Sequence, residues 1–178
     1  MIRLPAEWEP QQAVLFSFPR REGDWGPVLQ SASHAMLAAA RQIAQVCPVV
    51  MIVGDQEHYY QFTKDFPGQV LYQATDDSWI RDSGPITVLS PTPTLLDFTF
   101  NGWGGKFSAE HDNQLPWAIH RALFPQAQYT KVNVVLEGGA IETDGRGTFM
   151  TTSRCLLSKG RNDFQSKEEA EAVLRNEL

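Results

Sequence analysis

The stretch ITVLSPTPTLLDFTFNGWGGKFSAEHDNQLPWAIHRALFPQAQYTKVNVVL, residues 86–136, decides the fold, because it contains one complete structural unit. Two apolar runs on either side of a Ser/Pro/Thr loop are typical of a β-hairpin. An amphipathic run that follows an Asp-Asn cap predicts a helix, and a β-branched run then predicts a third strand. The predicted elements lie at 86–89, 94–100, 112–124 and 129–136. The order is therefore β-β-α-β.

The same order begins again after residue 136. Strands are predicted at 140–143 and 147–152, around an Asp-Gly turn, and a capping box predicts a helix from Ser166 to Glu177. The first strands lie 140 − 86 = 54 residues apart, and the helix caps lie 166 − 112 = 54 apart. Such periods are typical of repeat or propeller architectures. The second repeat ends before a closing strand, so we expect a fragment of a longer repeat protein. The alternative is a complete small α+β domain.

The first 80 residues add further strands and helices of an α/β protein. Short apolar runs that end at Pro or Gly predict buried strands, and an apolar stripe with helical spacing predicts a helix between two of them. The predicted elements are a strand at 13–18, a helix at 31–47, a strand at 49–53, a short helix at 55–66 and a strand at 69–73.

Composition narrows the classes of function. The chain has 178 residues, about one domain, and a formal charge of −6, which disfavours nucleic acid and suits a small cationic ligand. No apolar run approaches the ~18 residues of a membrane span, and the N-terminus does not resemble a signal peptide. Cys47 and Cys155 form no disulfide framework, and no metal-ligand spacing is present. We expect a cytoplasmic protein without a metal, whose exposed sheet edges favour self-association into a homo-oligomer.

Two motifs place carboxylates just before equivalent strands. DDSWIRDSGP (76–85) carries Asp82 four residues before a predicted strand, and LEGGAIETDGRGT (136–148) carries Glu137 three residues before another. If the repeats are related by rotation about an axis, both carboxylates point toward that axis. Together with Trp79 they suit a planar guanidinium, which binds carboxylates bidentately and stacks on aromatic rings. The alternatives are a solvated acidic loop around a core Trp, and a plain hairpin with an edge charge.

Two further motifs leave their roles open. FNGWGGKF (100–107) is either a structural loop around a buried Trp103 or a ligand contact. TTSRCLLSKGRN (151–162) contains Cys155, which is either a nucleophile or a small buried hydrophobe. None of the four histidines lies in a motif that would activate it. Cys47 ends an apolar helix stripe and is interpreted as core.

At these residues the sequence resembles the agmatine deiminase and bacterial-type peptidylarginine deiminase family. The matching segments are PAEWEPQQAVLFSFP (5–19), DDSWIRDSGP, FNGWGGKF, LEGGAIETDGRGTFMTT (136–152) and CLLSKGRN (155–162). The resemblance implies an α/β-propeller (pentein) of β-β-α-β units around a pseudo-fivefold axis. Residues 1–178 would then be the N-terminal part of a single guanidine-deiminase propeller domain.

The resemblance also implies roles for three residues. Asp82 falls on the aspartate that binds the substrate guanidinium, Trp79 on the Trp beside the substrate, and Glu137 on a further active-site carboxylate. The family's His-x-Asp motif and late catalytic Cys have no counterpart in these 178 residues, and Cys155 matches a family Cys that is not the nucleophile. Glu142 stands where many agmatine deiminases have His, which weakens the choice of agmatine over other guanidines.

The expected reaction of the whole enzyme is hydrolytic deimination, for example of agmatine to N-carbamoylputrescine and ammonia, a step of polyamine biosynthesis that leads toward putrescine. A Cys outside this chain would attack, Asp82 and Glu137 would hold the cation, and no cofactor is needed. We expect the chain alone to be inactive. The alternatives are a peptidylarginine deiminase and a non-catalytic guanidine-binding or remnant module.

Overall fold

The structure, a computed structural model, describes residues 2–54, 60 and 64–178 and is an α/β protein. It divides into two compact parts. The smaller part contains residues 10–80, and the larger part contains residues 1–9 and 81–178. Among the described residues no helix is both long and apolar enough to cross a membrane.

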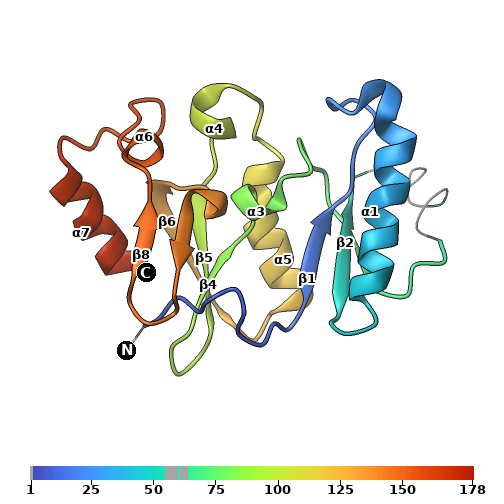
Figure 1. Ribbon diagram of the computed structural model, residues 1–178, viewed down its shortest axis with the longest axis horizontal. Coiled ribbons are helices and arrows are strands. Elements are labelled where there is room, and N and C mark those ends of the chain that lie inside the picture. Colours follow the sequence, from blue (N-terminus) through green and yellow to red (C-terminus); the bar gives the residue numbers. More distant parts are fainter. Residues whose placement is uncertain (1, 55–59, 61–63) are drawn as a thin grey trace. The chain divides into compact units, whose positions relative to one another are not determined.

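The smaller part is a parallel sheet packed on one long helix (Figure 1). Its elements are β1 (Val14–Ser17), η1 (Gly26–Val28), α1 (Leu29–Ile43), β2 (Val49–Val53) and β3 (Gln69–Tyr72). The sheet order is β1-β2-β3, and both pairings are parallel. Every residue of β2 is buried, as its unbroken apolar run predicts. The short helix predicted at 55–66 falls largely outside the described residues.

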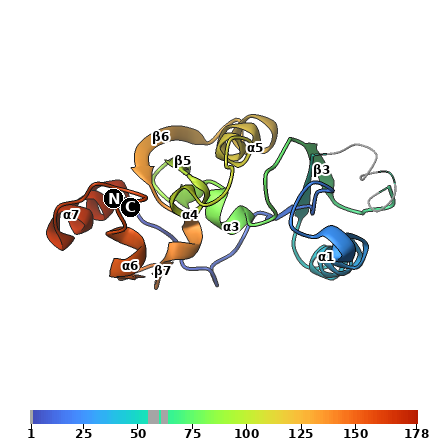
Figure 2. The ribbon, with the colours of Figure 1, turned by 90° about the horizontal axis from the view of Figure 1, so that it is seen from above.

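The larger part contains the predicted β-β-α-β repeat (Figure 1). Its elements are α3 (Ile80–Ser83, of which Ile80 belongs to the smaller part), β4 (Ile86–Val88), β5 (Thr94–Thr99), α4 (Gly102–Gly105), η2 (Asp112–Gln114), α5 (Leu115–Leu123) and β6 (Gln128–Val135). β4 pairs with β5 antiparallel, and β5 pairs with β6 parallel. The parallel pairing needs a crossover, which α5 supplies by packing along β5 (Figures 1 and 2).

The second repeat follows the first in the same order. Its elements are η3 (Gly138–Ala140), β7 (Ile141–Thr143), β8 (Phe149–Thr151), α6 (Ser153–Leu156) and α7 (Lys167–Glu177). β7 and β8 form the predicted hairpin, and the Ser166 hydroxyl caps α7 by accepting from the Glu169 amide. β7 begins one residue later than predicted, because the Ala140 amide bonds back to the Glu137 carbonyl and closes a turn.

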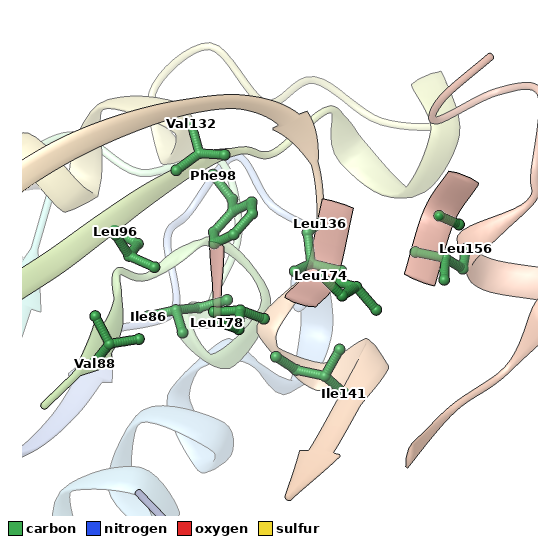
Figure 3. Packing of buried hydrophobic residues seen from close by; sticks show 11 residues of the cluster. Ile86, Val88, Leu96, Phe98, Val132, Leu136, Ile141, Leu156, Leu174 and Leu178 are labelled. Atoms are coloured by element: carbon green, nitrogen blue, oxygen red, sulfur yellow. The ribbon is translucent and has the colours of Figure 1, made fainter. Parts of the chain in front are cut away.

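One hydrophobic core joins the two repeats of the larger part (Figure 3). Strands β4 to β7 contribute from the sheet side, and α6 and α7 contribute from the helix side. The buried members are Ile86, Val88, Leu96, Phe98, Val132, Leu136, Ile141, Leu156, Ala170, Leu174 and Leu178. α7 is therefore docked by its apolar stripe. The N-terminal segment also belongs here, because Arg3 forms a β-bridge with Leu89.

A polar pair is buried on the β5–β6 face that α5 covers. Asp97 in β5 is only 2% exposed, and its Oδ2 accepts a hydrogen bond from the Tyr129 hydroxyl of β6. Its Oδ1 has no hydrogen-bond partner among the described residues. The Tyr129 ring contacts Trp117 and His120 of α5. The hydrogen bond from the Tyr129 hydroxyl therefore compensates for the burial of the Asp97 carboxyl group.

Replacing Tyr129 by Phe preserves the ring but removes this hydroxyl. We expect the free energy of unfolding to fall by about 1–3 kcal/mol near neutral pH, because Asp97 loses its buried partner. Burial, followed by the hydrogen bond and charge of Asp97, raises the pKa of Tyr129. A tyrosine pKa that is higher in the folded than in the unfolded state stabilises the fold. This contribution is complete below the ordinary tyrosine pKa of about 10 and is lost as the pH rises further.

The difference between wild type and Tyr129→Phe should therefore stay constant up to about pH 9 and narrow as the pH rises above about 10 in urea unfolding. Tyr72→Phe, at an exposed position of β3, is the matched control. A difference that is absent, or that stays constant above about pH 10, contradicts the role given to the Tyr129 hydroxyl.

Candidate functional site

Two short turns hold the predicted carboxylates in equivalent positions of the two repeats. Asp82 lies in α3, 86 − 82 = 4 residues before the first residue of β4. Glu137 lies directly before η3, 141 − 137 = 4 residues before the first residue of β7. Each first strand of a hairpin is thus preceded by one helical turn that carries an acidic side chain. Both carboxylates therefore lie at the entry to the first strand of a hairpin.

The two turns touch each other through the glycine pair of the second repeat. The Gly139 amide donates to Asp82 Oδ1 at 3.0 Å. A Cβ on Gly139 would lie 2.2 Å from that oxygen, and one on Gly138 would lie 2.3 Å from the Arg81 carbonyl oxygen. At Gly138 the obstacle is backbone, so that position requires glycine, whereas a Cβ at 139 would force the Asp82 carboxylate to move. The glycine pair thus allows a close approach to α3 of the same chain.

Trp103 supplies the second bond to Asp82. Its Nε1–H donates to Asp82 Oδ2 at 3.2 Å, and its ring makes edge contacts with Phe100 and Phe107. Its φ of 59° lies in the left-handed region, which is unusual for a bulky residue. The Asn101 side chain secures this turn by accepting from the Gly104 amide at 2.9 Å. The FNGWGGKF loop therefore orients Asp82 through Trp103.

Glu137 is held by a different partner. Only 3% of the residue is exposed, and its Oε1 accepts from Arg161 Nε at 2.6 Å. Arg161 is itself mostly buried. The next residue, Asn162, binds the end of β6 twice, with Oδ1 accepting from the Val135 amide at 3.0 Å and Nδ2 donating to the Val135 carbonyl at 2.8 Å. The GRN segment at 160–162 therefore positions the cation opposite Glu137.

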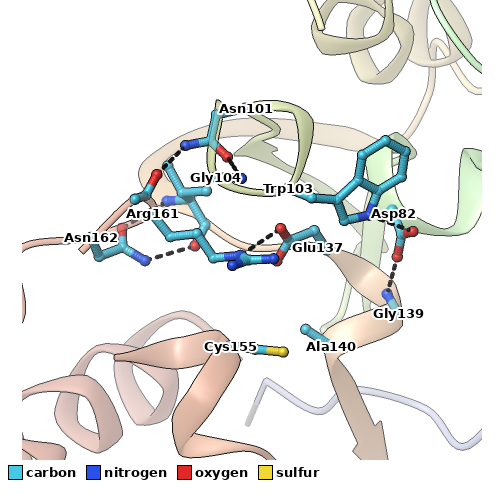
Figure 4. Close-up of polar contacts among 12 residues, drawn as sticks. Asp82, Asn101, Trp103, Gly104, Glu137, Gly139, Ala140, Cys155, Arg161 and Asn162 are labelled. Carbon is cyan, nitrogen blue, oxygen red and sulfur yellow. Dashed lines mark hydrogen bonds and ion pairs between the residues drawn. The ribbon is translucent and has the colours of Figure 1, made fainter. Parts of the chain in front are cut away.

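Figure 4 shows that these loops form one polar network. Asn101, which stabilises the Trp103 turn, also donates from Nδ2 to the Gly160 carbonyl at 2.8 Å. Gly160 is directly followed by Arg161, the partner of Glu137. The loop that orients Asp82 and the loop that neutralises Glu137 are thus linked to each other.

The electrostatic environments of the two carboxylates differ. Asp82 accepts from two neutral donors, an indole N–H and a backbone amide. The neighbouring Arg81 directs Nη2 to Glu7 at 2.6 Å rather than to Asp82. Asp82 has no ion pair within the described part of the chain, whereas Glu137 has Arg161. Of these two carboxylates, Asp82 is thus the one without an ion-pair partner among the described residues, and it is only partly buried.

The remaining candidates contribute less to this network. Trp79 belongs to the smaller part and its side chain is 58% exposed, so its place beside a ligand stays a prediction. In the same motif, Asp76 lies 3.7 Å from Arg20, and Asp77 Oδ1 accepts from the Ser78 amide. The Cys155 thiol is partly buried and has no hydrogen bond or ion pair with the described residues, which agrees with its interpretation as a structural Cys. Its side chain points toward Ala140 (Figure 4).

Sequence reasoning missed Trp103 as the partner of Asp82, and Arg161 as the partner of Glu137. Their motifs were visible, since the glycines of FNGWGGKF and the Arg-Asn pair of GRN lie in segments of the family pattern. The contacts of Trp103 and Arg161 could not be predicted, because their partners lie more than 20 residues away in the sequence. Within the described residues, no group of three His, Cys, Asp or Glu side chains could hold a metal ion.

Comparison with known proteins places this network in a protein family. The sequence profile of the Porphyromonas-type peptidyl-arginine deiminases matches residues 3–178. The agmatine deiminase of Stutzerimonas stutzeri (strain A1501) is 35% identical over 98% of this chain. The agmatine deiminase of Pseudomonas aeruginosa (strain LESB58) is 35% identical over 99% of it. In each case the chain spans 50% of the relative, about half of its length.

Solved structures agree with this assignment. A substrate-bound Cys-to-Ser variant of the C. jejuni agmatine deiminase superposes with a TM-score of 0.92 at 32% identity. It covers 99% of this chain, which spans 53% of that protein. The Enterococcus faecalis agmatine deiminase superposes with a TM-score of 0.84 at 32% identity, over 97% of this chain and 49% of its own. The α/β fold is therefore that of the agmatine and peptidylarginine deiminases.

Substituting Gly139 by Ala tests the contact between the two turns. The new Cβ would displace the Asp82 carboxylate, and we expect the free energy of unfolding to fall by about 1–3 kcal/mol. Gly54→Ala in the smaller part is the matched control, because a Cβ there meets its nearest atoms at an ordinary 3.5 Å. Urea unfolding of both variants measures the difference. Equal stability of the two variants would show that the turns do not approach as closely as described.

Proposed function

The chain belongs to the Porphyromonas-type peptidyl-arginine deiminase family, and on that premise we propose that it provides the guanidine-binding half of a deiminase. Asp82 is the proposed primary contact of the substrate cation. Glu137 is proposed as the second active-site carboxylate, and Trp79 as an aromatic residue beside the substrate. The proposal draws its fold and reaction class from the family, and its choice of Asp82 from the contacts of this chain.

The observation that carries the proposal is the uncompensated charge of Asp82. An ionised carboxylate offers about four lone-pair positions. Asp82 uses one on each oxygen, for Trp103 Nε1–H and for the Gly139 amide. One position on each oxygen therefore remains for the two parallel N–H donors of a guanidinium. Because both oxygens are already anchored, the carboxylate loses little freedom when such a cation binds.

The proposed reaction of the whole protein is hydrolysis of a guanidine to a urea and ammonia, with agmatine giving N-carbamoylputrescine. A cysteine thiolate supplied by residues outside this chain attacks the guanidinium carbon, and the C–N bond breaks as ammonia leaves with a proton from a general acid. Water then cleaves the carbon–sulfur bond, and the thiolate is released. Asp82 keeps the cation in place through both steps.

The complete architecture is proposed from the same premise. The β-β-α-β repeat observed here would recur around a central axis in a pentein propeller, of which residues 1–178 form the N-terminal part. On that view the chain alone does not turn over substrate. A peptidyl arginine is the second candidate substrate, because the family profile is described by that activity. A non-catalytic guanidine-binding module is a further candidate, since the carboxylates are present without the family's nucleophile.

Asp82→Asn tests the proposed contact while it preserves the size of the side chain. We expect agmatine to bind the 178-residue chain about ten to a hundred times more weakly in this variant, because a charge-assisted pair is lost. Isothermal titration calorimetry measures the affinity. Asp65→Asn, at an exposed position in the smaller part, makes the same change of net charge and should leave the affinity unchanged.

The outcomes separate the candidates. Equal agmatine affinity of wild type and Asp82→Asn would remove Asp82 from the site. Tighter binding of an arginine-containing peptide than of agmatine would favour peptidyl arginine. Formation of N-carbamoylputrescine or citrulline by the 178-residue chain itself would refute the proposed need for an outside nucleophile.

A further inference from the structure

A short N-terminal strap, residues 3–9, joins the far ends of the two strands that follow the carboxylate-bearing turns. The strap belongs to the larger part of the chain. We propose that it is a positioning element for the guanidinium site, with Arg3 as its central residue, because it sets how closely the Asp82 turn and the Gly139 turn approach each other. The identity of the ligand rests on the proposed function, whereas the role of the strap rests on its own contacts.

The two strands concerned are short and lie in different sheets. β4 (86–88) belongs to the sheet of β5 and β6, and β7 (141–143) pairs with β8. Apolar side chains of both strands share one core, but no strand pairing joins the two sheets among the described residues. Three residues of a strand span only about 10 Å. A shift at the exit of either strand therefore reaches the turn at its entry, where the Gly139 amide binds Asp82 Oδ1.

Arg3 contacts the exits of both strands. Its backbone forms a β-bridge with Leu89, directly after β4, through hydrogen bonds of 3.0 Å and 2.7 Å. Its Nη1 donates to the Gly145 carbonyl at 3.1 Å, in the turn after β7. One residue thus ties the end of β4 to the end of β7. Truncating its side chain would release the contact with Gly145 alone, because the bridge to Leu89 uses backbone atoms.

Glu9 holds the Arg3 side chain in this position. Its two carboxylate oxygens accept from Nη1 and Nη2 of Arg3, the second at 2.9 Å, and Oε1 also accepts from the Ala6 amide at 2.8 Å. The Arg3 hydrogen bond, followed by that of Ala6, holds the pKa of Glu9 below its ordinary value. A bidentate pair with a third donor is better ordered than an ordinary surface ion pair.

The strap fits closely against the turn after β7. A Cβ on Gly145 would lie 2.6 Å from Glu9 Oε1 and 2.8 Å from the Ala6 nitrogen. The φ of Gly145 is 71°, in the left-handed region that favours glycine. Close contact between the strap and this turn therefore depends on glycine at position 145.

A third contact reaches the Asp82 turn directly. Glu7 Oε1 lies 2.6 Å from Nη2 of Arg81, the residue before Asp82. More than half of each side chain in this pair is exposed, so the pair adds little to the free energy of unfolding. Its consequence is for the placement of α3. The strap therefore contacts α3, the exit of β4 and the exit of β7.

The first test truncates Arg3 and measures the contact between the two turns. In Arg3→Ala, hydrogen exchange of the Gly139 amide, followed by NMR, should be about tenfold faster, because its bond to Asp82 opens more often. The paired amides of β5 and β6 should keep their wild-type rates. Arg41→Ala removes an exposed arginine of α1, makes the same change in net charge and should leave the Gly139 rate unchanged.

Two results of this exchange experiment would overturn the inference. One is an unchanged Gly139 rate in folded Arg3→Ala. The other is an equal acceleration at Gly139 and throughout β5 and β6, which would show that the strap only stabilises the fold. If Arg3→Ala does not fold, Glu9→Ala replaces it, because Arg3 then loses the carboxylate that holds its side chain. A wild-type Gly139 rate in Glu9→Ala would also overturn the inference.

Agmatine binding measures the consequence for the proposed site. We expect the affinity of Arg3→Ala for agmatine to be about three- to tenfold weaker in isothermal titration calorimetry, because the two turns are less well placed. Arg41→Ala should bind like wild type. Equal affinities of wild type and Arg3→Ala, with a faster Gly139 rate, would show that the strap does not position the site. If wild type binds no agmatine, the proposed function fails, whereas the Gly139 rate still decides whether the strap holds the two turns together.

Discussion

The contact between Gly139 and Asp82 is the constraint on which the site depends. Two helical turns from successive repeats meet where the Gly139 amide binds Asp82 Oδ1 and where Gly138 lies against the Arg81 carbonyl. A side chain at 138 would push the turns apart, and one at 139 would displace the Asp82 carboxylate. The contact also ties the hairpin of β7 and β8 to α3, at the start of β4. The shared core behind them then closes over β4 to β7, α6 and α7.

The two carboxylates at this contact have different electrostatic roles. Glu137 is buried and neutralised by Arg161, and the GRN segment fixes that pair against the end of β6. Asp82 is partly exposed, and its bonds come from donors without charge. Among the described residues, Glu137 is therefore neutralised by an ion pair and Asp82 is not.

The loops around the site are linked because their polar groups bond to one another. Asn101 binds both the Gly104 amide and the Gly160 carbonyl, so it connects the turn of Trp103 with the segment of Arg161. Trp103 has a left-handed backbone that a large residue rarely adopts, and its indole bond to Asp82 and its contacts with Phe100 and Phe107 stabilise it there. Backbone strain of this kind is typical of functional sites, where it holds a side chain in a position that an unstrained backbone could not reach.

Residue patterns alone determined the order of the elements, because burial and turn formation depend on neighbours only a few positions apart. The apolar run at 49–53, the hairpin loop after Val88 and the capping box at Ser166 each specify a local structure, and the equivalence of Asp82 and Glu137 followed from their offset. The expected start of β7 was one residue early, because the Ala140 amide bonds back to the Glu137 carbonyl and extends the turn at 138–140. Only the tertiary structure decided that Trp103 orients Asp82 and that Arg161 occupies Glu137. Those partners lie 21 and 24 residues apart, and such pairings depend on how the loops pack rather than on any local pattern.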